Sequence, residues 1–352
     1  MANYDDLAMA VAAFGGNNKV IFDDVEKPSI MVGIPKMKYS DLISGGTQDV
    51  ADVFKVDGVE RNILYVSKYI NVVVNDRAYS LPMKDPRAYI NFDQSLAACR
   101  KKGAGWGLNP NALFGAIMLW CNRNGFLPRG NTNWDASYEK SYERGVNTYI
   151  DGTHGGGRTA TGSGPVTWNH DGTPAGIADL CGDVYEWTAG MRIVDGEIQI
   201  IPYGNCMKAD CDMSATSTEW KAIKPDGTLV DPGTSGTLHY DLVSSKIVIN
   251  TSRSAAFNSN IAFSQLAAAS GVSIPQIAKL HGLMKDTNDI YPTTGHQHYV
   301  NAEGERLPLR GSPFYRTSFG GVGCLSLDGA RSNSGDNVGF RSAYDEALAT
   351  GN

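Results

Sequence analysis

The sequence has a net negative charge and lacks a cluster of basic residues. Of its 352 residues, 19% are Asp, Glu, Lys or Arg, and the formal net charge at pH 7 is −6. Beyond the three basic residues 100–102, no basic cluster appears. Binding to nucleic acid or to an anionic membrane surface requires clustered Lys and Arg side chains. We therefore expect no nucleic acid among the partners of this chain.

Long apolar runs are missing as well. A membrane-spanning helix needs about 20 consecutive apolar residues, and no run approaches that length, so we expect no membrane insertion. The first residues, MANYDDLAMAVAAFGG, are acidic where a signal peptide is basic, and their apolar run is short. The sequence therefore predicts a protein that is made in the cytoplasm without a signal peptide.

Cysteine and histidine are scarce, and their spacing fits no common metal site. Cys206 and Cys211 are the only close pair among six cysteines, and a zinc site would need two further ligands nearby. We interpret all six as buried or incidental thiols. His296 and His298 have no apparent third ligand, so we expect them to be exposed polar residues. No cofactor is required by this pattern.

Glycine is abundant, at 40 residues, which suits a loop-rich α+β fold better than a helical one. Segments rich in Ile, Val and Tyr predict strands at 20–22, 30–32 and 62–75. Asp-Gly pairs predict hairpins around residues 57–58 and 195–196. Apolar residues at helical spacing predict one helix from about 91 to 102, and a second from Asn109 to about Gly125.

The chain divides into two parts that differ in their residue pattern. Residues 1–60 predict a small N-terminal β-rich element, a candidate attachment module, and residues 61–352 predict the main domain. Residues 203–300 are interpreted as an insertion into that domain. Within the insertion we expect a short helix at 260–269 and another after Ser273, where S-I-P-Q has the form of a capping box.

The stretch 307–344, LPLRGSPFYRTSFGGVGCLSLDGARSNSGDNVGFRSAY, combines aromatic with small polar residues. Tyr and Phe offer a large contact area at low entropic cost, and Ser, Thr, Asn and Asp offer adaptable hydrogen bonds. This chemistry is typical of a binding face. The alternative is a polar, glycine-rich terminal loop region without such a role.

Four short motifs resemble the formylglycine-generating-enzyme (sulfatase-modifying factor) branch of the C-type lectin fold. They are GDVYEW at 182–187, RGS at 310–312, ARS at 330–332 and GFR at 339–341, and they occur in the order found in that family. The resemblance implies an α+β, C-type-lectin-like domain with two helices on small twisted sheets, here accompanied by the N-terminal β-rich element.

Within this branch, the stretch 307–344 is similar to the variable region of diversity-generating retroelement proteins, such as the major tropism determinant of a bacteriophage. In those proteins a reverse transcriptase rewrites adenines in the last part of the gene. The resemblance implies a phage- or prophage-encoded receptor-binding protein, made in the bacterial cytoplasm and associated with the virion. Its partners would be a bacterial cell-surface protein or glycan and other virion proteins.

The resemblance also implies which residues face outward. The candidate ligand-binding residues are Ser312, Phe314, Tyr315, Arg316, Thr317, Ser318, Ser326, Asp328, Ser334, Gly335 and Asp336. The residues expected to point inward are Val322, Leu325, Leu327, Ala330, Val338 and Phe340. We expect Arg310, Arg331 and Arg341 to hold the loops by hydrogen bonds to carbonyl groups or acids.

An enzymatic role is not expected. The enzymes of this branch use a pair of cysteines between the RGGS-like and AR motifs, and here that segment holds only Cys324. The related sulfoxide synthases bind iron through three histidines, and the six histidines of this chain show no such arrangement. Two alternatives stay open: a phage structural or decoration protein with a fixed lectin-like fold, and a formylglycine-generating-like oxidase.

A structural calcium ion is a further open question. Formylglycine-generating enzymes bind calcium with a segment whose matching positions here are Asp179, Gly182, Val184 and Glu186. Two carboxylates and two carbonyl groups suit a hard cation. The alternative is that Glu186 is semi-buried and accepts backbone N–H bonds, so that the loop is held without an ion.

Overall fold

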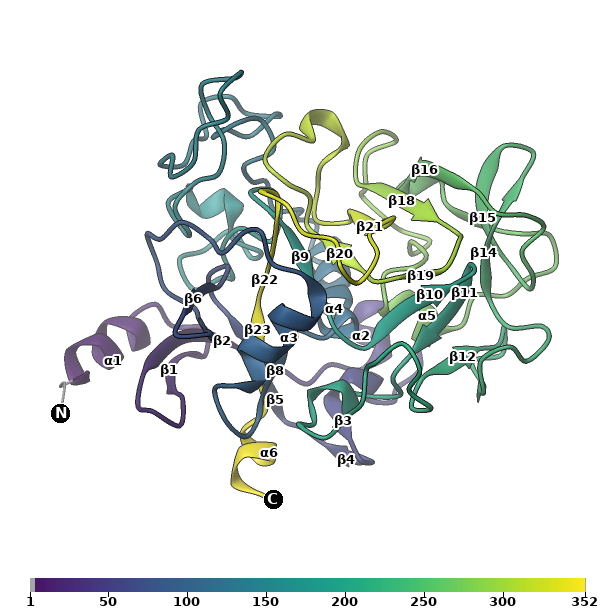
Figure 1. Ribbon diagram of the computed structural model, residues 1–352, viewed down its shortest axis with the longest axis horizontal. Helices are drawn as coiled ribbons and strands as arrows, with labels where there is room; N and C mark the ends of the chain where they lie inside the picture. The colour runs from purple at the N-terminus through teal and green to yellow at the C-terminus, as the bar shows by residue number, and fades with distance from the viewer. Residues whose placement is uncertain (1–3, 352) are drawn as a thin grey trace.

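The computed structural model describes residues 4–351 and shows a mixed α+β architecture made mainly of β-sheet (Figure 1). Residues 1–3 of the predicted N-terminal element, and residue 352, lie outside the described part. The helices of the described residues are α1 (Asp5–Ala12), α2 (Tyr39–Leu42), α3 (Phe92–Arg100), α4 (Asn111–Arg123), α5 (Gln276–Leu280) and α6 (Glu346–Thr350). Among these residues, no helix is long and apolar enough to span a membrane.

The first sheet joins both ends of the chain. Its strands, in spatial order, are β1 (Asn18–Phe22), β2 (Pro28–Pro35), β5 (Ile63–Ser67), β23 (Ser342–Tyr344) and β8 (Trp106–Leu108). All neighbours in this sheet are antiparallel. Strands on either side of residue 60 therefore share one sheet, and the predicted domain boundary at that residue stays a prediction.

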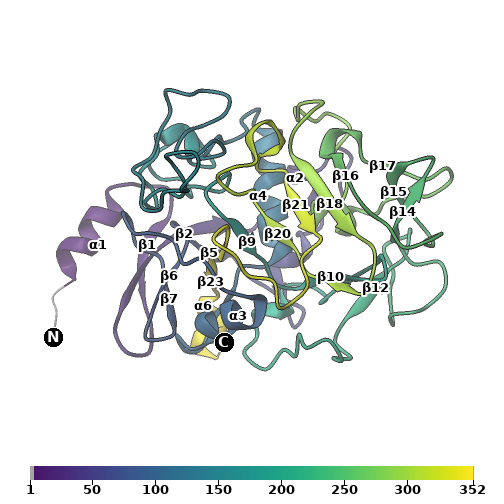
Figure 2. The same cartoon turned by 45° about the horizontal axis from the view of Figure 1, so that its top comes forward.

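The second sheet carries most of the C-terminal stretch. Its strands, in order, are β16 (Asn258–Ala262), β18 (Gln297–Asn301), β21 (Leu325–Leu327), β20 (Leu309–Arg310), β9 (Tyr185–Trp187) and β22 (Val338–Phe340). The segment with the GDVYEW motif thus lies between the segments with the RGS and GFR motifs. In Figure 2 the C-terminal chain runs through the middle of the molecule.

The third sheet is built largely by the predicted insertion. It contains β10 (Met191–Val194), β11 (Glu197–Ile200), β12 (Lys221–Ile223), β13 (Leu229–Val230), β14 (His239–Val243), β15 (Lys246–Asn250), β17 (Ala267–Ala268) and β19 (Glu305–Arg306). The hairpin predicted around residues 195–196 is confirmed by the pairing of β10 with β11. Strands β12, β14 and β15 lie at the right-hand end of Figure 1, away from α1.

Two small hairpins complete the strands. One consists of β3 (Lys55–Val56) and β4 (Val59–Glu60), and the other of β6 (Val72–Val74) and β7 (Arg77–Tyr79). The first is the hairpin predicted at residues 57–58. Asp57 and Gly58 both have positive φ, at 49° and 77°, as a tight type I′ turn requires.

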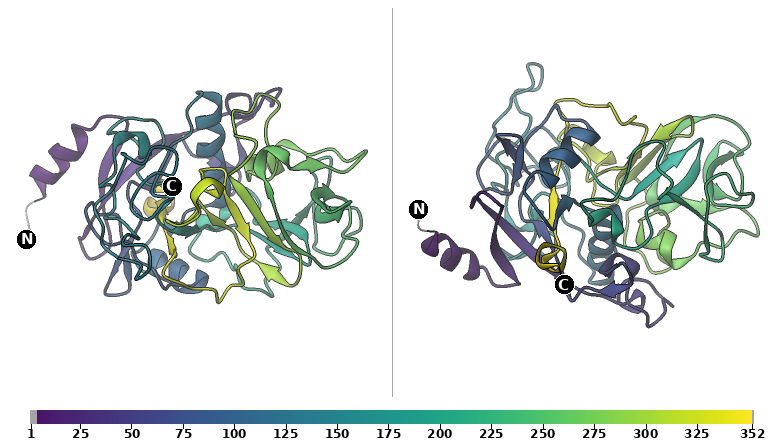
Figure 3. Two further views of the ribbon diagram at one scale, coloured as in Figure 1. Left: turned by 90° about the horizontal axis from the view of Figure 1, so that it is seen from above. Right: turned by 60° about the horizontal axis from the view of Figure 1, so that its bottom comes forward.

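The two predicted helices are both present. Helix α3 begins after Asn91, whose side chain accepts a bond from the backbone N–H of Gln94, while the Gln94 side chain accepts one from the backbone N–H of Asn91. This reciprocal cap satisfies donors that the first turn leaves free. Helix α4 is apolar on nearly all sides and almost entirely buried, as expected for a helix in the centre of a core. By contrast, α1 lies at the edge of the molecule in both views of Figure 3.

Three sequence-based predictions are wrong. A helix does follow Ser273, but the predicted capping box does not form, because the N-cap of α5 is Pro275 and no side chain caps the helix. Residues 260–269 form parts of β16 and β17 with a 3₁₀ turn between them, because β16 pairs with β18 along five residues. His296 and His298 are buried, at 4% and 0% exposure. The ring of His298 stacks on Phe263 at 4.7 Å, and Nδ1 of His296 accepts a bond from the Gly323 N–H at 3.0 Å.

Candidate functional site

The C-terminal stretch is anchored by an ion pair inside the molecule. Arg341 donates from Nε to both carboxylate oxygens of Glu186, at 3.0 and 2.8 Å, and neither side chain is exposed to any extent. Its other nitrogens donate to the carbonyl oxygens of Ser67, Lys68 and Ala178. Burial raises the pKa of Glu186, and the guanidinium of Arg341 opposes this rise. One arginine thereby connects β9, β5 and the C-terminal strands.

The other two motif arginines also hold loops, as predicted. Arg310 is fully buried and donates to the Asn111 side chain at 2.8 Å and to the His281 carbonyl. Arg331 donates to both carboxylate oxygens of Glu305, at 3.1 and 3.0 Å. Bidentate pairing of this kind fixes orientation as well as distance. Arg310 and Arg341 are buried beneath the stretch, whereas Arg331 is partly exposed.

Three predicted ligand-binding residues do not lie on the outer surface. Ser312, Phe314 and Ser326 are only 0%, 1% and 2% exposed. The backbone N–H of Phe314 donates to the Asp183 carbonyl at 3.0 Å, and its carbonyl accepts a bond from the Trp134 N–H at 2.8 Å. These two bonds fix the backbone so that the ring points inward. Ser326 lies in β21, which is paired on both edges. The expected outward placement of these three residues is therefore wrong.

The remaining predicted residues are at least partly accessible. Tyr315, Arg316, Thr317, Gly335 and Asp336 are half-buried, and Ser318, Asp328 and Ser334 are exposed. Phe319, which was not predicted, is 50% exposed. Of the residues expected inside, Val322, Leu325, Leu327, Val338 and Phe340 are buried, while Ala330 is half-buried. Buried segments and accessible segments thus follow one another along this short stretch.

Arg316 lies in a group of tyrosines that we call the arginine–tyrosine cluster. Its guanidinium is 4.4 Å from the ring centre of Tyr299, and its Nε donates to the Tyr185 hydroxyl at 3.3 Å. The Tyr315 ring is 5.5 Å away, and the hydroxyl of that residue accepts a bond from Asn337 at 2.7 Å. Cation–π contacts and hydrogen bonds together hold the partly exposed side chains of Tyr299, Tyr315 and Arg316 against the buried Tyr185. The cluster connects the two halves of the stretch.

A second set of contacts holds Asp336. The Tyr149 hydroxyl donates to its carboxylate at 3.2 Å, and Arg158 donates to its backbone carbonyl at 2.8 Å. The Arg158 guanidinium lies 4.3 Å from the Tyr149 ring centre and pairs with Asp85. Sequence reasoning missed Tyr149 and Arg158. In the sequence, the indication of a role for these two residues is that they lie on either side of a glycine-rich segment.

A cavity of about 400 Å³ adjoins the segment 317–321. Thr317 donates its backbone N–H to the Thr132 carbonyl at 2.7 Å, so the loop after α4 forms the facing wall. The polar lining residues are Arg129, Thr132, Ser137, Tyr138, Glu139, Cys181, Thr294, His296, Thr317 and Ser318. Most of these were not predicted, because they come from segments far from the C-terminal stretch. The loops that meet here lie side by side at the top of Figure 1.

The geometry does not favour calcium at the four matching positions, Asp179, Gly182, Val184 and Glu186. Both oxygens of Glu186 already accept bonds from a cation, the guanidinium of Arg341. Asp179 is buried and accepts a bond from the Gly162 N–H at 2.7 Å. The ion-free alternative fits better, with Arg341 in place of the backbone N–H groups expected as partners of Glu186.

The cysteines are buried thiols, as predicted. Burial raises the pKa of Cys324 to about 12 and raises that of Cys181 well above its usual range. Since the thiolate is the reactive form and the form that binds metal, neither sulfur is activated at neutral pH in this arrangement.

No protein-family model and no curated protein sequence matches this chain. Three solved structures align with most of it. A Major Tropism Determinant I1 variant is 12% identical over 90% of this chain and 63% of its own, with a TM-score of 0.32. PvdO from Pseudomonas aeruginosa is 14% identical over 93% and 98%, with a TM-score of 0.32. Treponema denticola variable protein 1 is 11% identical over 93% of this chain, with a TM-score of 0.34.

This chain thus spans less than two thirds of the length of the tropism determinant variant.

Proposed function

We propose that this chain is a non-enzymatic ligand-binding protein whose binding surface is formed by residues 315–319, 328 and 334–337. The observation that carries the proposal is the division of one stretch into a buried frame and an accessible set of side chains. Arg310, Arg341 and the apolar residues of β21 and β22 form the frame. Such a division lets the surface residues change while the fold is kept.

The chemistry of the surface suits a protein or glycan on a bacterial cell. The arginine–tyrosine cluster offers aromatic faces and a guanidinium, and Ser318, Ser334 and Asp328 offer hydrogen bonds. Tyr and Arg are the residue types that contribute most to binding energy at interfaces. The adjoining cavity of about 400 Å³ gives room for a protruding ligand group.

The order of the four motifs supports a more specific proposal. The chain would have a C-type-lectin-like fold of the formylglycine-generating-enzyme branch and would be a variable protein of a diversity-generating retroelement. It would be encoded by a phage or prophage, made in the bacterial cytoplasm without a signal peptide, and associated with the virion beside other virion proteins. A fixed structural or decoration protein is the competing proposal, and the unactivated thiols weigh against the oxidase.

Sequencing codons 307–344 in a mixed population distinguishes the first two proposals. Substitutions concentrated at 315–318 and 334–336, with 338–340 unchanged, are expected for a diversified binder. A constant stretch would leave the fixed virion protein as the better explanation.

Binding itself is tested with purified protein on bacterial cell envelopes. Tyr315→Ala is expected to weaken retention by about 30-fold or more, because removal of a central interface tyrosine costs about 2 kcal/mol. Tyr142→Ala is the matched control, since Tyr142 is 77% exposed and outside the proposed surface. Equal retention of both variants on envelopes that retain the wild type would refute the assigned surface.

A further inference from the structure

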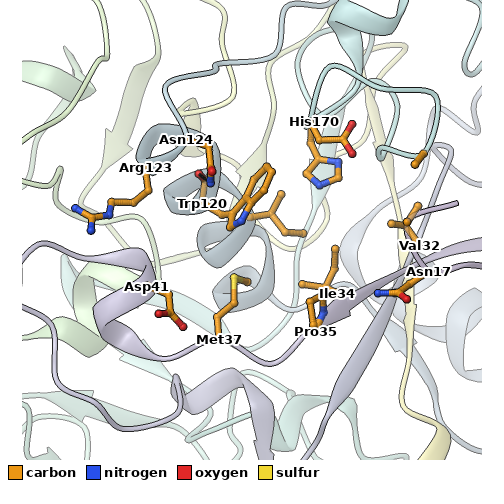
Figure 4. A pocket seen from close by; sticks show the side chains of 15 residues that line it. Asn17, Val32, Ile34, Pro35, Met37, Asp41, Trp120, Arg123, Asn124 and His170 are labelled. Carbon is orange, nitrogen blue, oxygen red and sulfur yellow. Dashed lines mark hydrogen bonds between the residues drawn. The ribbon is translucent and has the colours of Figure 1, made fainter.

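A second cavity, of about 550 Å³, lies between the C-terminal half of α4, the end of β2 and the loop that follows His170 (Figure 4). Its volume is in the range of small-molecule sites. The lining includes Ile34, Met37, Trp120, Arg123 and His170. None of its lining residues belongs to the stretch 307–344.

The middle of this cavity is apolar and aromatic. Ile34 and Met37 come from the β2 side, and Trp120 from α4. The α4 side chains before Trp120 are buried, but Trp120 is only half-buried, because its ring lines the cavity. The rings of Trp120 and His170 are 5.5 Å apart and tilted by 47°. Together they form an aromatic corner that suits a flat apolar body.

His170 supplies a directed hydrogen-bond donor. Its Nδ1 accepts a bond from the Ile177 N–H at 2.8 Å, so the neutral ring carries its proton on Nε2. Burial lowers the pKa of His170 to about 4, while Asp171 opposes and Lys68 reinforces this change. Figure 4 shows the ring directed into the cavity. A neutral N–H donor, not a cation, therefore faces a ligand above about pH 5.

We propose that this cavity binds a small, uncharged aromatic molecule whose hydrogen-bond acceptor reaches Nε2–H of His170. A phosphate-bearing ligand is disfavoured, because Arg123 is the only basic residue of the lining and already donates to Ser44 at 3.0 Å. Two lining carboxylates, Asp41 and Asp171, would repel an anion further. The site is separate from the proposed binding surface and does not depend on it.

Benzamide, a ring with a carbonyl acceptor, is the probe, and toluene is the matched probe without an acceptor. Affinities are measured by NMR titration of the full chain. His170→Asn keeps an acceptor for the Ile177 N–H but removes the Nε2–H donor. This variant is expected to lower the affinity for benzamide about threefold to tenfold, which is the contribution of a neutral hydrogen bond. Its affinity for toluene should be unchanged. Trp120→Ala should abolish binding of both probes, and Tyr142→Ala should change neither.

The wild type gives an independent readout that needs no variant to fold. Benzamide should shift the Nε2–H resonance of His170, and toluene should not produce the same downfield change. The proposal is overturned if benzamide does not bind the wild type, if His170→Asn binds it equally well, or if the His170 resonance is unmoved at saturation.

Discussion

At the scale of single residues, buried charge decides how the C-terminal stretch is held. Arg341 and Glu186 are both buried and bonded to each other through two contacts. A charge in such a place is tolerated only while its partner is present. Glu186 belongs to the GDVYEW motif and Arg341 to the GFR motif. Their role is therefore to hold the loops in place and not to contact a ligand.

Arg341→Met is expected to lower the free energy of unfolding by about 3–5 kcal/mol, because Glu186 would remain buried without a partner. Urea unfolding monitored by circular dichroism measures this change. The double variant Arg341→Met/Glu186→Leu should recover part of the loss, since no unpaired charge is left. A single-variant loss below about 1 kcal/mol would contradict the assigned role.

Phe314 and Ser318 test the division between frame and surface. Phe314→Ala is expected to cost about 3–5 kcal/mol of stability, because it empties a buried site. Ser318→Ala should stay within about 0.5 kcal/mol of the wild type, because the side chain is exposed. Both values come from the same unfolding titration. Similar costs for the two variants would show that the surface is not separable from the fold.

At the scale of elements, α4 is the helix around which the core is arranged. It packs against α2 on one side and α5 on another, and its glycine permits the second contact. A Cβ at Gly115 would overlap the carbonyl oxygen of Leu280, which ends α5. The sequence predicted α4 from its apolar spacing, but nothing in that spacing indicates which helix lies against Gly115.

Gly115→Ala should therefore destabilise the protein, although Ala is favoured over Gly in a helix by about 1 kcal/mol. The backbone overlap is expected to outweigh this gain and to produce a net loss of about 1–3 kcal/mol. Thermal unfolding gives the comparison. Ala97→Gly, at an exposed position of α3, is the control and should show the ordinary propensity cost of about 1 kcal/mol. A rise in stability for Gly115→Ala would refute the close contact.

At the scale of the whole molecule, the sheets are assembled from segments distant in sequence. Strand β23 lies between β5 and β8, and β22 lies beside β9. This assembly buries several titratable groups, among them His296, whose pKa burial lowers to about 4. A buried neutral histidine binds its proton less readily in the folded than in the unfolded chain.

The contribution of His296 to stability should consequently fall on acidification, whereas buried carboxyls with raised pKa values, such as Glu186, act in the opposite direction. Between pH 6.5 and about pH 4 the unfolded chain binds a proton at His296 that the folded chain does not, so the His296 contribution to the free energy of unfolding decreases as pH falls through this window. The His296 contribution at pH 4.5 is about 2–3 kcal/mol. Urea unfolding at pH 7 and pH 4.5 measures the difference. His296→Asn, which keeps an acceptor for Gly323, should lose less on acidification, and an equal loss would contradict the prediction.

Local patterns in the sequence determined the elements whose cause is local. The apolar spacing of α3 and α4 and the Asp-Gly turns depend on residues within a few positions of each other, so they could be predicted. Of the residues of the C-terminal stretch that were expected to point inward, all but Ala330 are buried. This could be predicted because burial of apolar side chains is favourable whichever strand carries them.

Only the tertiary structure decided which polar and aromatic residues are accessible. Phe314 lies inside because bonds to Trp134 and Asp183 carry it there, and residues 260–269 are partly strand because β18 is available to pair with β16. Tyr149, Arg158 and Tyr299 meet the C-terminal stretch from distant segments. The physical reason is that the exposure of a side chain and the pairing of a strand depend on neighbours in space. These neighbours come from segments that are far apart in the sequence.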